Sequence, residues 1–100
     1  MPTEEHIWLE VTCYALRQDH GGWDIECGPL PFSEILAMHR ANNPAAAVVE
    51  ITSRRVRRDI SAEEDKTMRQ EFIACAKEHG WSFDALNVCW NAPDGMQRRG

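Results

Sequence analysis

Two groups of residues in this sequence have side chains that bind ligands or do chemistry. The first lies in the segment SRRVRRDISAEED, from 53 to 65, where four arginines in five positions stand directly before four acids in seven. We call these four basic residues the arginine strip; they are Arg54, Arg55, Arg57 and Arg58. Such a concentration of positive charge is a candidate contact for phosphate groups or for an acidic protein surface.

The second group is the segment CAKEH, from 75 to 79, which places the Cys75 thiol and the His79 imidazole one helical turn apart. Zinc sites use this spacing, but they need further ligands. The remaining cysteines are well separated and form no C-x-x-C pair; they are Cys13, Cys27 and Cys89. Because Cys75 falls on the apolar stripe of the predicted helix, we expect a buried structural thiol there. The pair could also be a nucleophile and its base, but no sequence feature supplies an oxyanion hole or lowers a thiol pKa. We expect no metal, no cofactor and no enzymatic activity.

Three interpretations of the arginine strip stay open. In the first, its charges form a solvated network with the nearby acids and block edge-to-edge pairing of strands. In the second, the strip binds nucleic acid, but without its four arginines the chain has seven basic and sixteen acidic residues, a charge of −9 that repels phosphate. In the third, the arginines dock onto an acidic protein surface while the acidic body faces a basic one. Electrostatics disfavours the second interpretation.

Length and composition favour one globular domain in the cytoplasm. A chain of 100 residues with four tryptophans can bury one core, and its apolar and charged fractions lie in the globular range. No window approaches the roughly 18 apolar residues that span a bilayer, so we expect no membrane association. The N-terminal sequence is acidic, unlike a secretory signal. In a reducing compartment the four cysteines would be free thiols.

Hydrophobic periodicity predicts four strands and two helices. Apolar residues alternate in the strand segments, Gly21 and Gly22 predict a turn between the first two strands, and Ser33 is the expected cap of the first helix. The Ser61 and Glu64 pair has the spacing of a capping box, which predicts the start of the second helix. The expected strands cover 6–17, 23–27, 45–53 and 83–90, and the expected helices cover 34–41 and from Ser61 to about 79.

The resulting fold class is α+β, in the order β-β-α-β-α-β. We expect a single domain over 1–91, with a largely antiparallel four-stranded sheet and both helices packed on one face, and a loose tail over 92–100. The other face of the sheet would then carry Trp8 and Tyr14 in contact with solvent. A free face with aromatic side chains is a candidate for binding a protein partner or for homodimerisation.

The arginine strip follows the third predicted strand. If that strand continues, Arg54 and Arg58 lie on one face and Arg55 and Arg57 on the other, which requires the strand to project beyond the sheet or to bulge near Ser53. Arginines and large aromatic residues carry most interface energy, and the acids offer a second kind of contact. The candidate partner-binding residues are therefore Arg54, Arg55, Arg57, Arg58, Trp8, Tyr14, Trp23, Asp19, Asp24, Glu26, Glu63 and Glu64.

A small acidic domain with an arginine strip, an aromatic face and no catalytic constellation resembles the anti-CRISPR proteins in size and charge. These are inhibitors encoded by bacteriophages and mobile elements; they share no motif, so the resemblance covers overall character alone. It implies a non-enzymatic phage protein that acts in the host bacterial cytoplasm, binds a CRISPR effector (Cas) complex and blocks target DNA engagement. The alternative interpretation is a small nucleic-acid-binding regulator that uses the strip from Arg54 to Arg58.

Overall fold

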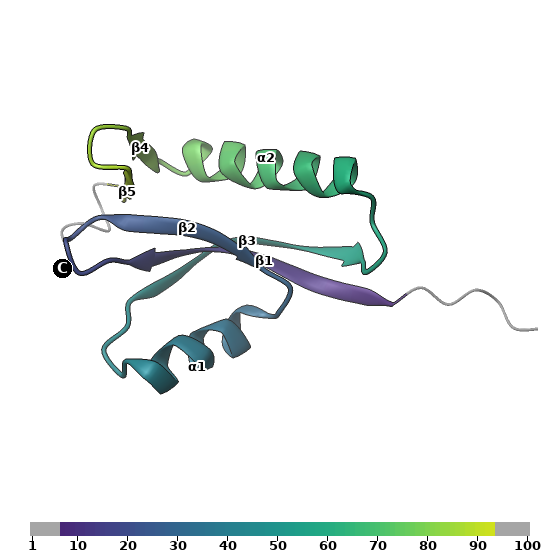
Figure 1. Cartoon of the computed structure of the whole chain (residues 1–100), viewed down its shortest axis with the longest axis horizontal. Helices are drawn as coiled ribbons and strands as arrows, with labels where there is room; N and C mark the ends of the chain where they lie inside the picture. Colours follow the sequence, from purple (N-terminus) through teal and green to yellow (C-terminus); the bar gives the residue numbers. More distant parts are fainter. Residues whose placement is uncertain (1–6, 94–100) are drawn as a thin grey trace, which may run out of the picture.

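A computed structural model describes residues 7–93 and has an α+β fold, a five-stranded antiparallel sheet with two helices (Figure 1). Its elements are β1 (Trp8–Arg17), β2 (Trp23–Gly28), α1 (Phe32–Asn42), β3 (Val48–Arg57), α2 (Ala62–Glu78), β4 (Ser82–Asp84) and β5 (Cys89–Asn91). The strand order is β3-β1-β2-β5-β4, which places β3 and β4 at the edges. Of the expected tail over 92–100, residues 94–100 lie outside the described part.

β1 and β2 form the predicted hairpin. The Gln18 N–H donates to the Gly22 carbonyl at 2.8 Å, and the Gly21 N–H donates back to the Gln18 carbonyl at 3.0 Å. Gly21 has a φ of 98°, a conformation that glycine adopts without a steric penalty. Gly22 packs so closely on β5 that a Cβ there would lie 2.5 Å from the Cys89 Sγ. Both glycines are therefore required, for different reasons.

α2 covers the face of the sheet to which the odd-numbered residues of β1 point. The predicted capping box is present, because the Glu64 N–H donates to the Ser61 Oγ at 3.1 Å and the Ser61 N–H donates to the Glu64 carboxylate at 3.2 Å. The buried residues of the helix are Met68, Phe72 and Ala76. They pack in two clusters that include Val11, Cys13 and Ala15. Cys75, which we expected to be buried, is only half-buried.

α1 lies on the opposite face of the sheet from α2, so the expectation that both helices share one face was wrong (Figure 1). The reason is that β1 buries its polar positions as well. Thr12 is 0% exposed and donates its hydroxyl to the Leu30 carbonyl at 2.8 Å. Ile35 of α1 packs over Gly28, where a Cβ would lie 3.3 Å from the Ile35 Cδ1. Burial of a polar side chain costs little free energy when the side chain has a hydrogen-bond partner inside the protein. The pattern of polar and apolar residues does not reveal such a partner, so the pattern alone predicted that this face was exposed.

The first helix also begins earlier than expected. It starts at Phe32, and the cap position is Pro31, whose extended backbone carries no side-chain cap; Ser33 lies inside the first turn. Proline suits a helix start because its fixed φ matches the helical value and its missing N–H needs no partner there. Ser33 as the cap was therefore a wrong prediction.

The expected closing strand over 83–90 is instead a hairpin of two short strands, β4 and β5. The Asp84 carboxylate accepts hydrogen bonds from the N–H groups of Leu86 and Asn87, and Val88 has a φ of 51°, so the chain reverses between the strands. Leu86 is 91% exposed, although its alternation with Val88 predicted a buried position. Asp84 can hold a turn through its side chain, and this local bonding overrides the apolar alternation.

Truncation of Ile35 tests the position of α1. Because Ile35 is the buried anchor of this helix, Ile35→Ala should lower the free energy of unfolding by about 2–5 kcal/mol. Met38→Ala, at an exposed position of the same helix, should change it by less than about 0.5 kcal/mol. Urea denaturation of both variants measures the difference. Equal, small losses would show that α1 does not pack on the sheet.

Candidate interaction surface

The arginine strip begins inside β3, which is an edge strand of the described sheet. Cys13 of β1 pairs with Thr52, but Tyr14 pairs with Glu50, so Ile51 is an extra residue on β3 and forms a β-bulge. The bulge lies two residues before Ser53, close to the position predicted for it in one of the two alternatives. Beyond it the pairing with β1 continues regularly to Arg57, and the Arg58 N–H still donates to the Ile7 carbonyl at 2.8 Å.

The arginines divide between the two faces of the sheet, as strand alternation predicted. Arg54 points to α2, where its guanidinium donates to the Glu71 carboxylate at 2.6 Å and lies 5.9 Å from the centre of the Phe72 ring. Arg55 and Arg57 stand on the other face, since they pair with Glu10 and Trp8 of β1. The strip therefore forms two separate surfaces rather than one basic patch.

We call the surface formed by Trp8, Glu10, Arg55 and Arg57 the open ribbon face. It belongs to the end of the β1–β3 pair, which extends beyond α1 (Figure 1). Within the described residues no helix lies over it. Trp8 is 50% exposed, and the Arg55 guanidinium lies 5.5 Å from the centre of its ring. This diagonal contact holds an indole and a guanidinium side by side at the surface of a rigid strand pair.

The charge of the open ribbon face is mixed. Arg57 lies 3.9 Å from the Asp59 carboxylate, and Glu10 is the direct cross-strand partner of Arg55. These two acids balance the charge of the two arginines, but exposed ion pairs in water are weak, so each guanidinium can exchange its partner for a carboxylate of another protein. A face of this kind suits a protein surface, on which carboxylates and apolar groups alternate, better than a continuous run of phosphates.

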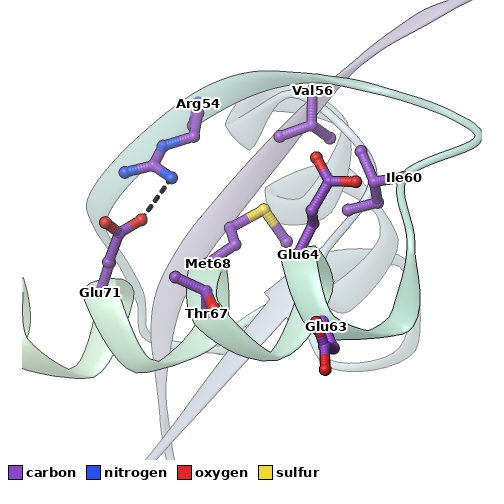
Figure 2. A pocket seen from close by; sticks show the side chains of 8 residues that line it. All are labelled: Arg54, Val56, Ile60, Glu63, Glu64, Thr67, Met68 and Glu71. Atoms are coloured by element: carbon purple, nitrogen blue, oxygen red, sulfur yellow. Dashed lines mark hydrogen bonds and ion pairs between the residues drawn. The ribbon is translucent and has the colours of Figure 1, made fainter.

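Behind the other face of the same ribbon end lies a groove of about 380 Å³ between β3 and α2 (Figure 2). Val56, Ile60 and Met68 provide its apolar part, and the ion pair between Arg54 and Glu71 crosses from strand to helix at one end. Glu63, Glu64 and Thr67 complete its lining. The groove is open at the edge of the sheet and would accept an apolar side chain with a cationic end.

Two aromatic candidates from the sequence do not belong to the surface. Tyr14 is buried beneath α1, and its hydroxyl lies 3.3 Å from the His39 Nε2. Trp23 is buried in the core and packs edge-on against Trp81 with ring centres 5.5 Å apart. Both were expected to be partner-binding anchors, and their burial overturns that expectation. Tyr14 is not accessible because α1 covers the face of the sheet on which it lies. Trp23 is not accessible because the β4–β5 segment folds back over it.

The acidic candidates divide into two groups. Glu63 and Glu64 lie in the first turn of α2 beside the arginines, but the hydrogen bonds of the cap hold the pKa of Glu64 below its usual range. Asp19, Asp24 and Glu26 are exposed near the hairpin turn. Since Asp24 pairs with Leu16 and Arg57 pairs with Trp8, eight positions of β1 separate the two ends, about 25 Å. The arginines, with acids among them, therefore lie at one end of the sheet, and Asp19, Asp24 and Glu26 lie at the other.

Cys75, which is half-buried, and the exposed His79 approach each other at the C-terminal end of α2. The Cys75 Sγ lies 3.7 Å from the His79 Nδ1, which also contacts the Cys75 carbonyl at 2.8 Å. Over residues 7–93 there is no group of three or more histidine, cysteine or acidic side chains that could hold a metal ion.

The candidate contact residues from the sequence did not include Glu10 and Glu71. Glu10 has a signal in the sequence, since it shares the strand period of Trp8, but its partner Arg55 depends on the β1–β3 register. Glu71 contacts Arg54 only because α2 crosses the strip, and nothing in the local sequence reports a contact over 17 positions.

Comparison of the chain with protein-family models, with curated proteins and with solved structures gives no significant match. The helices within residues 7–93 are too short or too polar to cross a membrane.

Replacement of tryptophans tests whether Trp8 is a surface residue. Trp8→Ala should lower the free energy of unfolding by less than about 1 kcal/mol, because half of the indole is already in water. Trp23→Ala removes a core aromatic residue and should cost about 3–5 kcal/mol. Chemical denaturation compares the two variants. A similar, large cost at both positions would mean that Trp8 is structural.

The burial of Tyr14 can be tested by titration, because it is the only tyrosine of the chain. Burial, followed by the charges of Glu26 and other neighbours, raises the pKa of Tyr14 above its ordinary value of 10.0. The neutral phenol of Tyr14 therefore stabilises the folded state fully below about pH 10. This contribution is lost as the pH rises through the pKa that Tyr14 has in the folded state. Tyrosinate absorbance should show a higher midpoint in the native protein than in urea. Identical midpoints would contradict the burial.

Proposed function

We propose that the chain is a non-enzymatic binding module, which contacts an acidic region of a protein partner through the open ribbon face. The observation that carries this proposal is the half-exposed Trp8, held by Arg55 beside Arg57 on a part of the sheet that no described helix covers. Tryptophan and arginine are the residues that most often dominate binding energy. Here they stand on paired strands, so little conformational freedom is lost when a partner binds.

Charge supports a protein partner over a nucleic acid. The −5 net charge of the chain repels a phosphate backbone, and Glu10, Asp59 and Glu71 lie among the arginines. Nucleic-acid binding through the strip is the alternative function. It would give an affinity that falls steeply with salt and would disappear on nuclease treatment.

The resemblance to anti-CRISPR proteins gives the proposal a narrower form. In this form the partner is a CRISPR effector complex, and the two ends of the sheet act together. The arginine end would bind an acidic surface of the complex, and the acidic end around Asp19 and Asp24 would face a basic DNA-binding channel. Inhibition of target DNA binding by a purified effector complex tests this form, and an effector that binds DNA equally with and without the chain would rule out that effector as the target.

Reversal of two charges tests the contact surface. Arg55→Glu with Arg57→Glu should weaken partner binding at least about tenfold, because two arginine anchors become repulsive toward an acidic surface. Quantitative affinity capture from a nuclease-treated bacterial lysate measures which proteins the wild-type chain retains and the variant loses.

The matched control is Lys66→Glu with Lys77→Glu, which makes the same change in charge at exposed positions of α2. It should retain the captured proteins. Equal loss in both variants would show that net charge, and not the open ribbon face, governs binding. Capture that depends on nucleic acid in an untreated lysate would favour the alternative function.

A further inference from the structure

Two of the four cysteines stand directly opposite each other in the sheet. Cys13 of β1 and Cys27 of β2 are register partners, so both side chains project from the same face, beneath α2. The sequence places them 14 positions apart and gives no sign of the pairing. All four cysteines are free thiols.

The hydrogen-bond pattern of the hairpin places this pair at a site that favours a disulfide. The Gln18 N–H donates to the Gly22 carbonyl next to the turn. Hydrogen-bonded and non-hydrogen-bonded pairs alternate along an antiparallel ladder, and Cys13–Cys27 lies five steps further along the same register. It is therefore a non-hydrogen-bonded pair, for which the typical Cα separation is about 4.5 Å and the side chains are closest. That separation lies within the range spanned by disulfides.

The two thiols have different surroundings. Cys13 is completely buried, whereas Cys27 is half-buried and lines a cavity of about 150 Å³ between the sheet and the start of α2. Arg69 also lines this cavity and lies 2.9 Å from the Asp65 carboxylate. A hydrogen bond from Cys13, helped by the positive charge of Arg69 and opposed by burial, lowers the pKa of Cys27. The same hydrogen bond, together with burial, raises the pKa of Cys13.

We propose that Cys13 and Cys27 form a two-electron oxidation site, which reacts with a small peroxide and closes to an intramolecular disulfide. Cys27 is the attacking residue because it is accessible from the cavity, and Cys13 is the resolving residue because it lies opposite in the register. The role is independent of the open ribbon face and of any partner.

The chemistry balances with hydrogen peroxide as the oxidant. The Cys27 thiolate attacks one peroxide oxygen, the O–O bond breaks, and the departing hydroxide takes up a proton to leave as water, so that Cys27 becomes a sulfenic acid. The Cys13 sulfur then attacks the Cys27 sulfur, the S–O bond breaks, and the departing hydroxide takes the Cys13 proton to form a second water. Two thiols lose two electrons in total, and one peroxide is reduced to two waters.

Peptide mapping of the wild-type chain tests the proposal directly. Trypsin cuts after Arg17, Arg40, Arg69 and Lys77, so each cysteine falls on a different peptide. After treatment of the reduced protein with one equivalent of hydrogen peroxide, two of the four thiols should be lost. The cross-linked peptides should be those that end at Arg17 and Arg40. A link from either cysteine to Cys75 or Cys89, a link between two chains, or retention of all four thiols would overturn the proposal.

Single substitutions separate the two roles. Cys13→Ala should leave a Cys27 sulfenic acid that dimedone traps, whereas Cys27→Ser should abolish both the trapped adduct and the disulfide. Cys75→Ser is the matched control, since Cys75 of α2 lies near the pair without being a register partner of either cysteine, and this variant should still form the disulfide. Trapping of Cys75 in preference to Cys27 in the wild-type chain would show that the reactive thiol is elsewhere. The wild-type map decides the question even if the variant at the buried Cys13 does not fold.

Discussion

The structure depends on the burial of both faces of β1. Five consecutive residues, Val11–Ala15, are buried, because α2 covers the odd-numbered side chains and α1 covers the even-numbered ones. Such a strand needs an internal partner for each polar group that it buries. The Leu30 carbonyl serves Thr12, and His39 serves Tyr14. The two faces of β1 thus determine where the two helices pack. The end of β1 that α1 does not cover contributes Trp8 and Glu10 to the open ribbon face.

Much of the fold could be predicted from the sequence where the signal is local. The β1–β2 hairpin follows from its glycines, α2 follows from its capping box, and the fold class follows from the order of strands and helices. The side of the sheet on which α1 lies could not be predicted, since an alternation of polar and apolar residues reports polarity and not the partners that make a polar residue acceptable in a core. The β4–β5 turn was missed because its three polar contacts centre on the single side chain of Asp84.

The candidate surface was predictable in composition but not in shape. Strand alternation correctly separated Arg54 from Arg55 and Arg57, and a bulge near Ser53 was one of the two alternatives that the charge pattern left open. The contacts that fix the positions of the arginines join residues distant in sequence, such as Arg55 with Trp8 and Arg54 with Glu71. Cys13 and Cys27 are a further case, because only the register brings them together. Both the open ribbon face and the Cys13–Cys27 pair therefore depend on contacts between strands, which the pairing of the sheet determines.

The single register pair between β2 and β5, Trp23 opposite Trp90, has a consequence for the motions of the molecule. The β4–β5 hairpin is attached to the sheet mainly by packed indole rings, whereas residues 12–16 of β1 pair with a strand on each side. Segments with few ladder hydrogen bonds open at a lower free energy than the strands at the centre of a sheet. Amide hydrogens of residues 82–91 should therefore exchange with solvent through local opening, and those of residues 12–16 of β1 only through global unfolding. The β4–β5 hairpin, which opens at the lowest free energy, lies at the end of the sheet away from the arginines. Its local opening therefore leaves the open ribbon face intact.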